Sequence, residues 1–175
     1  AELAKTFDHM TETIHQRDTA LKVAEVEQRK KLDFINAIFD TANSLIVVLD
    51  RQGHIERMNR AGESLVGYTC DEIKGQYFWD VFLLDGEREA VKSVFSTIFA
   101  GGVVPRYENH WRCKDGGVRL FDWSNSALLD EHGAVEYIVS VGIDITKRKA
   151  LEFEVWHLAY SDPLTNLPNR RLFQD

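Results

Sequence analysis

Apolar residues recur with an alternating spacing of four and three over residues 3–38, which is the period of a coiled-coil contact. The repeat visits Leu3, Phe7, Met10, Ile14, Arg17, Leu21, Ala24, Gln28, Lys31, Ile35 and Ile38. Eight of these eleven positions are apolar, and neither glycine nor proline precedes Gly53. The pattern predicts a long helix over residues 1–42 that forms a parallel homodimer, weakened by the polar residues in its middle. Two interpretations remain open: a passive dimerisation stalk, or a contact that switches register and so transmits a twist.

Short alternating segments separated by turn residues follow this helix. Residues 45–49 and 54–58 flank the turn "DRQG" and predict a hairpin. Three more strands are predicted at residues 106–113, 118–129 and 134–144, separated by the turns "KDGG" and "DEHG". Helical patterns lie between the two groups of strands. This order predicts an α+β fold with a five-stranded antiparallel sheet and helices on one face.

The helical patterns cover residues 61–69, 71–82 and 87–99. Asp71 and Asp85 are plausible N-caps for the second and third of them, because aspartate accepts hydrogen bonds from the first free backbone N–H groups. The third helix places its apolar residues on one face: Val91, Val94, Phe95, Ile98 and Phe99. Gly101 and Gly102 are expected to end it.

Charge and cysteine content exclude several classes of function. The net charge is −7 and no basic block is present, so a nucleic-acid partner is not expected. The two cysteines fit neither a disulfide framework nor a metal site, which indicates reduced thiols. No apolar run approaches the roughly 20 residues that cross a bilayer. We therefore expect the segment itself to be cytoplasmic.

Residues 33–147 resemble a PAS domain. The resemblance rests on "VVLDRQGHI", "NRAGESLVGYTCDEIKG", "RCKDGGVRLFDWS" and the closing "GIDITKRKALE". It implies the PAS fold, flanked here by the N-terminal helix and by a linker helix over residues 146–160. It also implies a sensing and dimerisation module that is not itself an enzyme.

Two short segments resemble signalling domains of other kinds. Residues 1–10, "AELAKTFDHM", are similar to the end of a HAMP domain. Residues 161–175 begin "SDPLTNLPNRR", which resembles the first motif of GGDEF diguanylate cyclase domains. Together they imply a segment of an inner-membrane bacterial protein that relays a signal to a diguanylate cyclase making cyclic di-GMP. The resemblance leaves open whether an EAL phosphodiesterase domain follows.

The PAS resemblance raises the question of a cofactor. Haem-binding members offer a histidine from the long helix, and residues 87–99 contain none. Light-sensing members bind flavin through a cysteine, but Cys70 lacks the neighbours of that motif. A flavin bound without a covalent bond remains an alternative, since Trp111 and Trp123 are predicted on adjacent strands facing the same side. The other interpretation is that the two indoles fill the core with their N–H groups bonded.

Asn109 shares the inward face of its strand with Trp111. A buried amide without a partner costs about 1–3 kcal/mol, so Asn109 is expected to bond a backbone group or a small-molecule ligand. Paired carboxylates, a Ser-His-Asp spacing and a phosphate-binding glycine loop are not found in the sequence. We therefore predict no catalytic residues and no metal site.

The last strand leads directly into the linker helix. Asp144 is predicted to cap this helix, and Thr146 to fix the angle at which the chain leaves the sheet. Leu151, Val155 and Leu158 then lie on one apolar face suited to a partner helix. This arrangement predicts a mechanical relay through Asp144 and Thr146. The rival interpretation is a ligand-free spacer that only holds two copies together.

Overall fold

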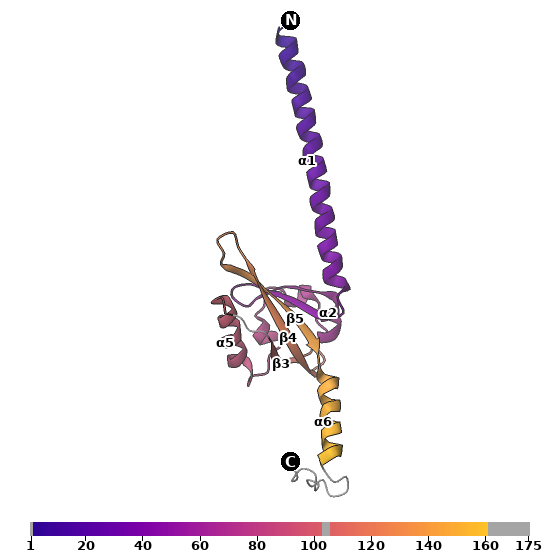
Figure 1. Ribbon diagram of the computed structural model, residues 1–175, viewed down its shortest axis with the longest axis vertical. Helices are drawn as coiled ribbons and strands as arrows, with labels where there is room; N and C mark the ends of the chain where they lie inside the picture. The colour runs from indigo at the N-terminus through magenta and orange to yellow at the C-terminus, as the bar shows by residue number, and fades with distance from the viewer. Residues whose placement is uncertain (1, 103–105, 161–175) are drawn as a thin grey trace. The chain divides into compact units, whose positions relative to one another are not determined.

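The computed structural model describes residues 2–102 and 106–160, with side chains from His15 onward except Gln16 (Figure 1). The chain divides into two compact units, residues 1–41 and 42–175. The GGDEF-like motif at 161–175 lies outside the described residues, as do the side chains of the HAMP-like segment.

The first unit is a single helix, α1, which spans Glu2–Thr41 as the repeat predicted. The apolar side chains of Leu21, Ile35 and Ile38, which belong to the repeat, are 57–61% exposed. Glu27 and Lys31 form an ion pair one turn apart on the same helix. An exposed apolar row is what a helix–helix contact requires, and the coiled coil stays a prediction.

The second unit contains the five-stranded antiparallel sheet, which confirms the predicted fold (Figure 1). Its strands are β1 (Leu45–Leu49), β2 (Ile55–Met58), β3 (Tyr107–Arg112), β4 (Val118–Leu129) and β5 (Val135–Asp144). The order across the sheet is β2-β1-β5-β4-β3, so the first and last strands of the domain pair at its centre. Strand β3 therefore forms an edge.

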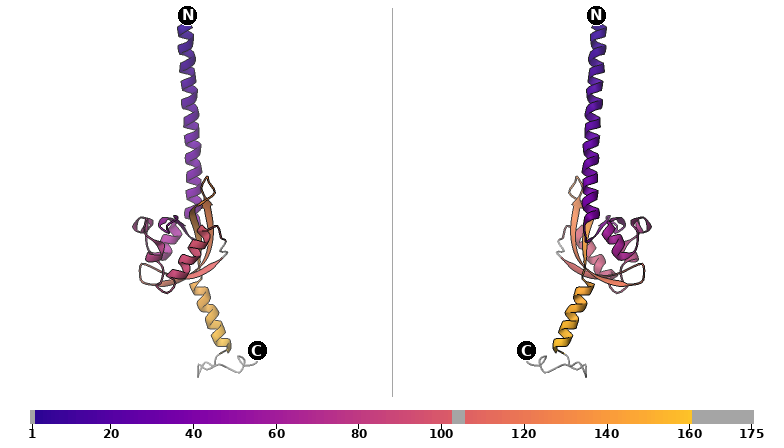
Figure 2. Two further views of the ribbon diagram at one scale, coloured as in Figure 1. Left: turned by 90° about the vertical axis from the view of Figure 1, so that its left-hand side faces the viewer. Right: turned by 90° about the vertical axis from the view of Figure 1, so that its right-hand side faces the viewer.

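Four helices lie on one face of this sheet (Figure 2). They are α2 (Arg60–Val66), α3 (Cys70–Ile73), α4 (Phe78–Val81) and α5 (Arg88–Phe99). A last helix, α6 (Thr146–Tyr160), leaves the end of β5. The expectation of one helix over residues 71–82 is wrong, because the backbone of residues 75–76 leaves the helix to pair with Ile55 of β2. Gly75 permits the break with a φ of +76°.

The two aspartates predicted as N-caps do not have that role. Helix α3 begins after Thr69, whose N–H donates to the Glu72 carboxylate at 2.9 Å. Helix α5 begins after Glu87, and Asp85 instead pairs with Arg88 at 3.3 Å. Helix α3 thus starts at a local capping box, and α5 starts at Glu87, whose carboxylate contacts His110 of β3.

The core lies between the sheet and the helices. The apolar face predicted for α5 contributes Val91 and Ile98 to it as buried residues. Asn59 is fully buried at the start of α2, where its Oδ1 accepts from Ile46 N–H at 2.9 Å and its amide donates to Ser44 at 2.9 Å. This side chain joins α2 to β1.

Candidate functional site

A cavity lies between α5 and the inner face of the sheet. Its polar lining residues are Tyr107, Asn109, Trp111, Trp123, Asn125 and Ser140, and the remainder of the lining is aliphatic or phenylalanine. The free volume is about 40 Å³. A water needs roughly 10–15 Å³ on this scale and a drug-sized ligand roughly 300–1,000 Å³. The cavity as it stands is therefore closed to any but the smallest molecules.

The two predicted tryptophans meet in this cavity. Trp111 on β3 and Trp123 on β4 have ring centroids 4.5 Å apart. The other face of Trp111 stacks on Phe82 at 4.0 Å with an interplanar angle of 7°. A ring inserted between the two indoles would need about 7 Å, two contacts of roughly 3.5 Å each. The packed indoles leave no such space, so the geometry does not support a flavin stacked between them.

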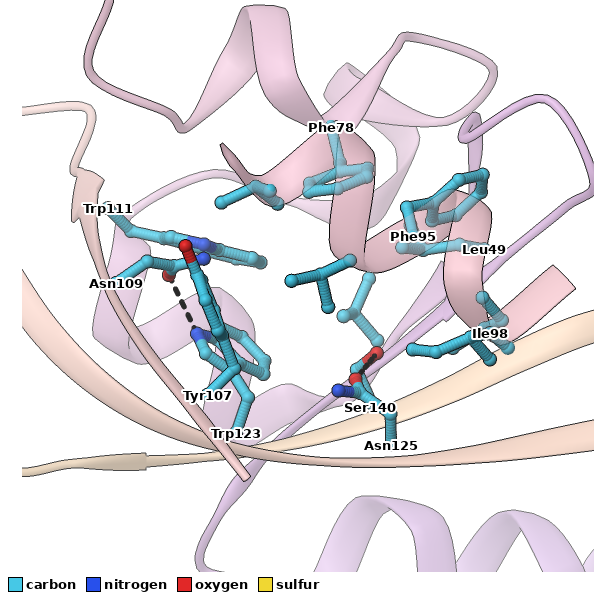
Figure 3. A pocket seen from close by; sticks show the side chains of 14 residues that line it. Leu49, Phe78, Phe95, Ile98, Tyr107, Asn109, Trp111, Trp123, Asn125 and Ser140 are labelled. Carbon is cyan, nitrogen blue, oxygen red and sulfur yellow. Dashed lines mark hydrogen bonds between the residues drawn. The ribbon is translucent and has the colours of Figure 1, made fainter. Parts of the chain in front are cut away.

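Asn109 has a side-chain partner in place of the backbone group expected from the sequence. Its Oδ1 accepts a hydrogen bond from Trp123 Nε1 at 2.8 Å (Figure 3). The partner is thus a neighbouring side chain rather than a backbone group. The pairing satisfies the Trp123 indole and fixes the orientation of the Asn109 amide beside Trp111.

The expectation that both indole N–H groups are bonded holds for only one of them. Trp111 is 2% exposed, and its Nε1 has no hydrogen-bond acceptor among the described residues. A buried donor left without a partner costs about 1–3 kcal/mol. The cavity therefore contains one costly, unused donor next to the Asn109 amide.

A second polar pair lies at the other end of the cavity. Ser140 Oγ on β5 donates to Asn125 Oδ1 on β4 at 2.7 Å. Figure 3 shows this pair on the opposite side from Asn109 and Trp111. The sequence reasoning missed both residues, although strand alternation could have found them. Side chains two residues apart on a strand point to the same face. Asn125 therefore faces the same way as buried Trp123, and Ser140 the same way as buried Ile138.

The start of α5 is attached to the edge strand of the sheet. Glu87 Oε2 accepts from the backbone N–H of His110 at 2.8 Å, and its Oε1 lies 2.7 Å from His110 Nδ1. His110 is 43% exposed, and this contact holds its ring against Glu87. The sequence alone did not indicate Glu87, because its partner lies 23 residues away.

The predicted relay residues meet at the junction of β5 and α6. Asp144 Oδ1 accepts from Thr146 N–H at 2.9 Å, and Thr146 Oγ1 accepts from Leu120 N–H at 2.8 Å. Arg119, which the sequence reasoning missed, donates to Asp144 Oδ2 at 2.6 Å. The first turn of α6 is thus bonded to β4 as well as continuous with β5.

Electrostatics at this junction favour the charged carboxylate. Partial burial alone would raise the pKa of Asp144, but hydrogen bonds with Thr146 and Arg119 outweigh it and lower the pKa below its ordinary value. Burial raises the pKa of the Cys113 thiol nearby, with Arg119 opposing. A thiol kept protonated in this way is a poor nucleophile.

The cavity and the junction are in direct contact. Gly142 of β5 is paired with Trp123 of β4 across the sheet. A Cβ added at Gly142 would lie 2.7 Å from the Trp123 ring, so the indole packs against the bare backbone. Asp144 is only two residues farther along the same strand. The Trp123 ring is thus packed against the strand that carries Asp144.

Residues 2–102 and 106–160 contain no group of three or more His, Cys, Asp or Glu that could hold a metal. No helix in these two ranges is both long and apolar enough to span a membrane.

The chain belongs to the PAS fold family, whose match covers residues 39–150. It is 31% identical over 145 residues to the cyclic di-GMP phosphodiesterase PdeR of Escherichia coli K12, covering 82% of this chain but only 22% of PdeR. It is 27% identical over 136 residues to the sensor histidine kinase TmoS of Ectopseudomonas mendocina, covering 75% of this chain and 14% of TmoS. The described fold is thus a PAS sensory domain of bacterial signalling proteins.

One similar PAS domain has been solved with ligands. The PAS domain of the Cronobacter turicensis quorum-sensing receptor RpfR, in complex with BDSF, is 32% identical to this chain with a TM-score of 0.52. The match covers 60% of this chain and 96% of the RpfR domain. The same domain in complex with C12:0 gives a TM-score of 0.53.

Proposed function

We propose that this chain is the sensory and dimerisation module of a bacterial cyclic di-GMP signalling protein, and that it binds an amphipathic small molecule under α5. The observation that carries the proposal is the Nε1 of Trp111, which has no acceptor among the described residues and lies in a cavity lined mostly by apolar side chains. A ligand oxygen that accepted this N–H would remove a cost of about 1–3 kcal/mol. The Asn109 amide beside it offers further polar contact.

The apolar part of the cavity indicates what the remainder of such a ligand should be. Leu49, Phe95 and Ile98 line the cavity on the side away from Asn109 and Trp111 (Figure 3). A hydrocarbon chain suits this lining. The complex of the RpfR domain with C12:0, a saturated fatty acid, supports the same ligand class. The small free volume requires α5 to move when the chain enters.

Movement of α5 and of the two indole rings would be transmitted through β5 to α6. Trp123 packs on Gly142, and Asp144 and Thr146 join that strand to α6. Leu151 and Val155 on α6 are 51% and 66% exposed, which suits pairing with the same helix of a second copy. The ligand would therefore change the geometry of a dimer.

We propose further that this geometry controls a diguanylate cyclase domain. Residues 161–175 resemble the first motif of such a domain, and residues 1–10 resemble the end of a HAMP domain, which supports a longer protein at the inner membrane. The similarity to PdeR supports the cyclic di-GMP pathway.

The test is direct titration of purified residues 1–175 with dodecanoic acid by calorimetry. Trp111→Phe keeps an aromatic ring and removes the donor, so the loss of about 1–3 kcal/mol should lower affinity roughly five- to 150-fold. Trp156→Phe on the exposed face of α6 is the matched control and should bind like the wild type. Equal affinity for the wild type and Trp111→Phe would contradict the proposed contact.

The closed cavity also favours a second candidate function. A free volume of about 40 Å³ is consistent with a ligand-free spacer that only holds two copies together. This alternative predicts no heat of binding and no small molecule extracted from the denatured protein.

A further inference from the structure

An open groove of about 690 Å³ lies beside the closed cavity. It runs between the C-terminal end of α5 and the hairpin that joins β4 to β5. Its larger apolar lining residues are Ile98, Phe99, Leu129 and Val135, with Ala127 on its floor. The Arg51 side chain stands on its rim, paired with Asp130 at 2.6 Å.

The groove and the cavity share two lining residues, Ile98 and Asn125. Figure 3 shows both at the end of the cavity opposite Asn109 and Trp111. Ile98 is 7% exposed, so its side chain fills the passage between the two spaces rather than opening it. The groove is thus continuous with the far end of the cavity once Ile98 moves.

The packing around Ile98 is separate from the main core. Ile98, Val135 and Ile138 form a small cluster of their own, with Phe95 and Phe99 packed against it. The start of α5, by contrast, is attached by the charged contact between Glu87 and His110 described above. Opening α5 at its C-terminal end disturbs apolar contacts that a hydrocarbon chain can replace.

We propose that an acyl ligand enters through this groove, passes Ile98, and leaves the end of its chain in the groove. This inference rests on the proposed ligand-binding function. The polar head lies inward, because Trp111 has an unused donor there whereas Arg51 at the rim is already paired. Ile98 therefore determines the chain length that the domain accepts.

The experiment measures how affinity depends on chain length. Purified residues 1–175 are titrated by calorimetry with saturated fatty acids of eight to sixteen carbons, each below its critical micelle concentration. Ile98→Trp should keep the affinity for the shortest chain and lose at least tenfold for the longest. Ser96→Trp puts the same bulk on the exposed side of the same helix and should match the wild type.

A second variant covers the case in which Ile98→Trp fails to fold. Ala127 is exposed and lines the groove but not the cavity, so Ala127→Trp narrows the groove without entering the core. It should lower affinity for long chains only. Arg51→Gln should leave all affinities unchanged.

The outcomes separate the two proposals. One outcome is that the wild type binds fatty acids while Ile98→Trp and Ala127→Trp show the same dependence of affinity on chain length. In that case the ligand does not enter through the groove, and the proposed function stands. If Arg51→Gln alone abolishes binding, the head lies at the rim and the inferred orientation is wrong. If the wild type binds no chain of any length, the proposed function fails, and this inference fails with it.

Discussion

Replacing Asp144 with alanine tests the relay between the PAS core and α6. The change removes two hydrogen bonds, from Thr146 N–H at 2.9 Å and from Arg119 at 2.6 Å. The first resembles a helix cap, which contributes about 0.5–2 kcal/mol. The second joins side chains that are 40% and 20% exposed, so it contributes about 1 kcal/mol or less.

The free energy of unfolding should therefore fall by about 1–3 kcal/mol. A domain has a typical stability of about 5–15 kcal/mol, so the fold should survive. Each kcal/mol lowers Tm by roughly 2–8 °C for domains in this range of size. Asp144→Asn is the matched variant, because its amide oxygen still accepts from Thr146 while the charge opposite Arg119 is lost. It should lose less stability than Asp144→Ala.

The pH dependence of stability gives an independent check on the same carboxylate. The pKa of Asp144 is lower in the folded state, so its charge stabilises the fold above the unfolded pKa of about 3.9. That contribution is lost as the pH falls through the lower, folded pKa. The difference in unfolding free energy between wild type and Asp144→Asn should therefore be constant near pH 7 and shrink below about pH 4.

Transmission is measured by amide hydrogen exchange in α6, with and without dodecanoic acid. In the wild type, ligand should change exchange in the first turns of α6. Asp144→Ala should bind the ligand, remain folded, and show little or no change there. If the variant shows the full response, Asp144 is only a turn residue and the relay through it is refuted.

Three further predictions concern other parts of the chain. Glu87→Ala removes both contacts with His110 and should lower the free energy of unfolding, measured by chemical denaturation, by about 1–3 kcal/mol. The control is Glu89→Ala, whose side chain is 89% exposed and which should change the free energy of unfolding little. Residues 1–175 should form a weak dimer in analytical ultracentrifugation, and Ile35→Glu should shift it to monomer; a wild type that stays monomeric at high micromolar concentration would contradict the helix seam. The same protein incubated with GTP and magnesium should make no cyclic di-GMP, and product detected by chromatography would refute this.

The sequence by itself determined the strands and their order. Alternation and turn residues placed β1 and β4 at their observed bounds and β2, β3 and β5 within a residue of theirs. These signals are local, because an inward strand residue or an Asp-Gly turn is recognisable from its immediate neighbours. The same alternation predicted Asn109, Trp111 and Trp123 on the inner face of the sheet, where the structure has them.

Only the tertiary structure decided which of these residues meet. The partner of Asn109 lies 14 residues away, that of Glu87 lies 23 away, and that of Asp144 lies 25 away. Each pairing depends on the register between strands and on the path of the intervening helices, which local patterns do not specify. The same holds for the unpaired Trp111 donor and for the groove behind Ile98. A cavity is the space that packed elements leave between them, and it exists only after the sheet and α5 have come together.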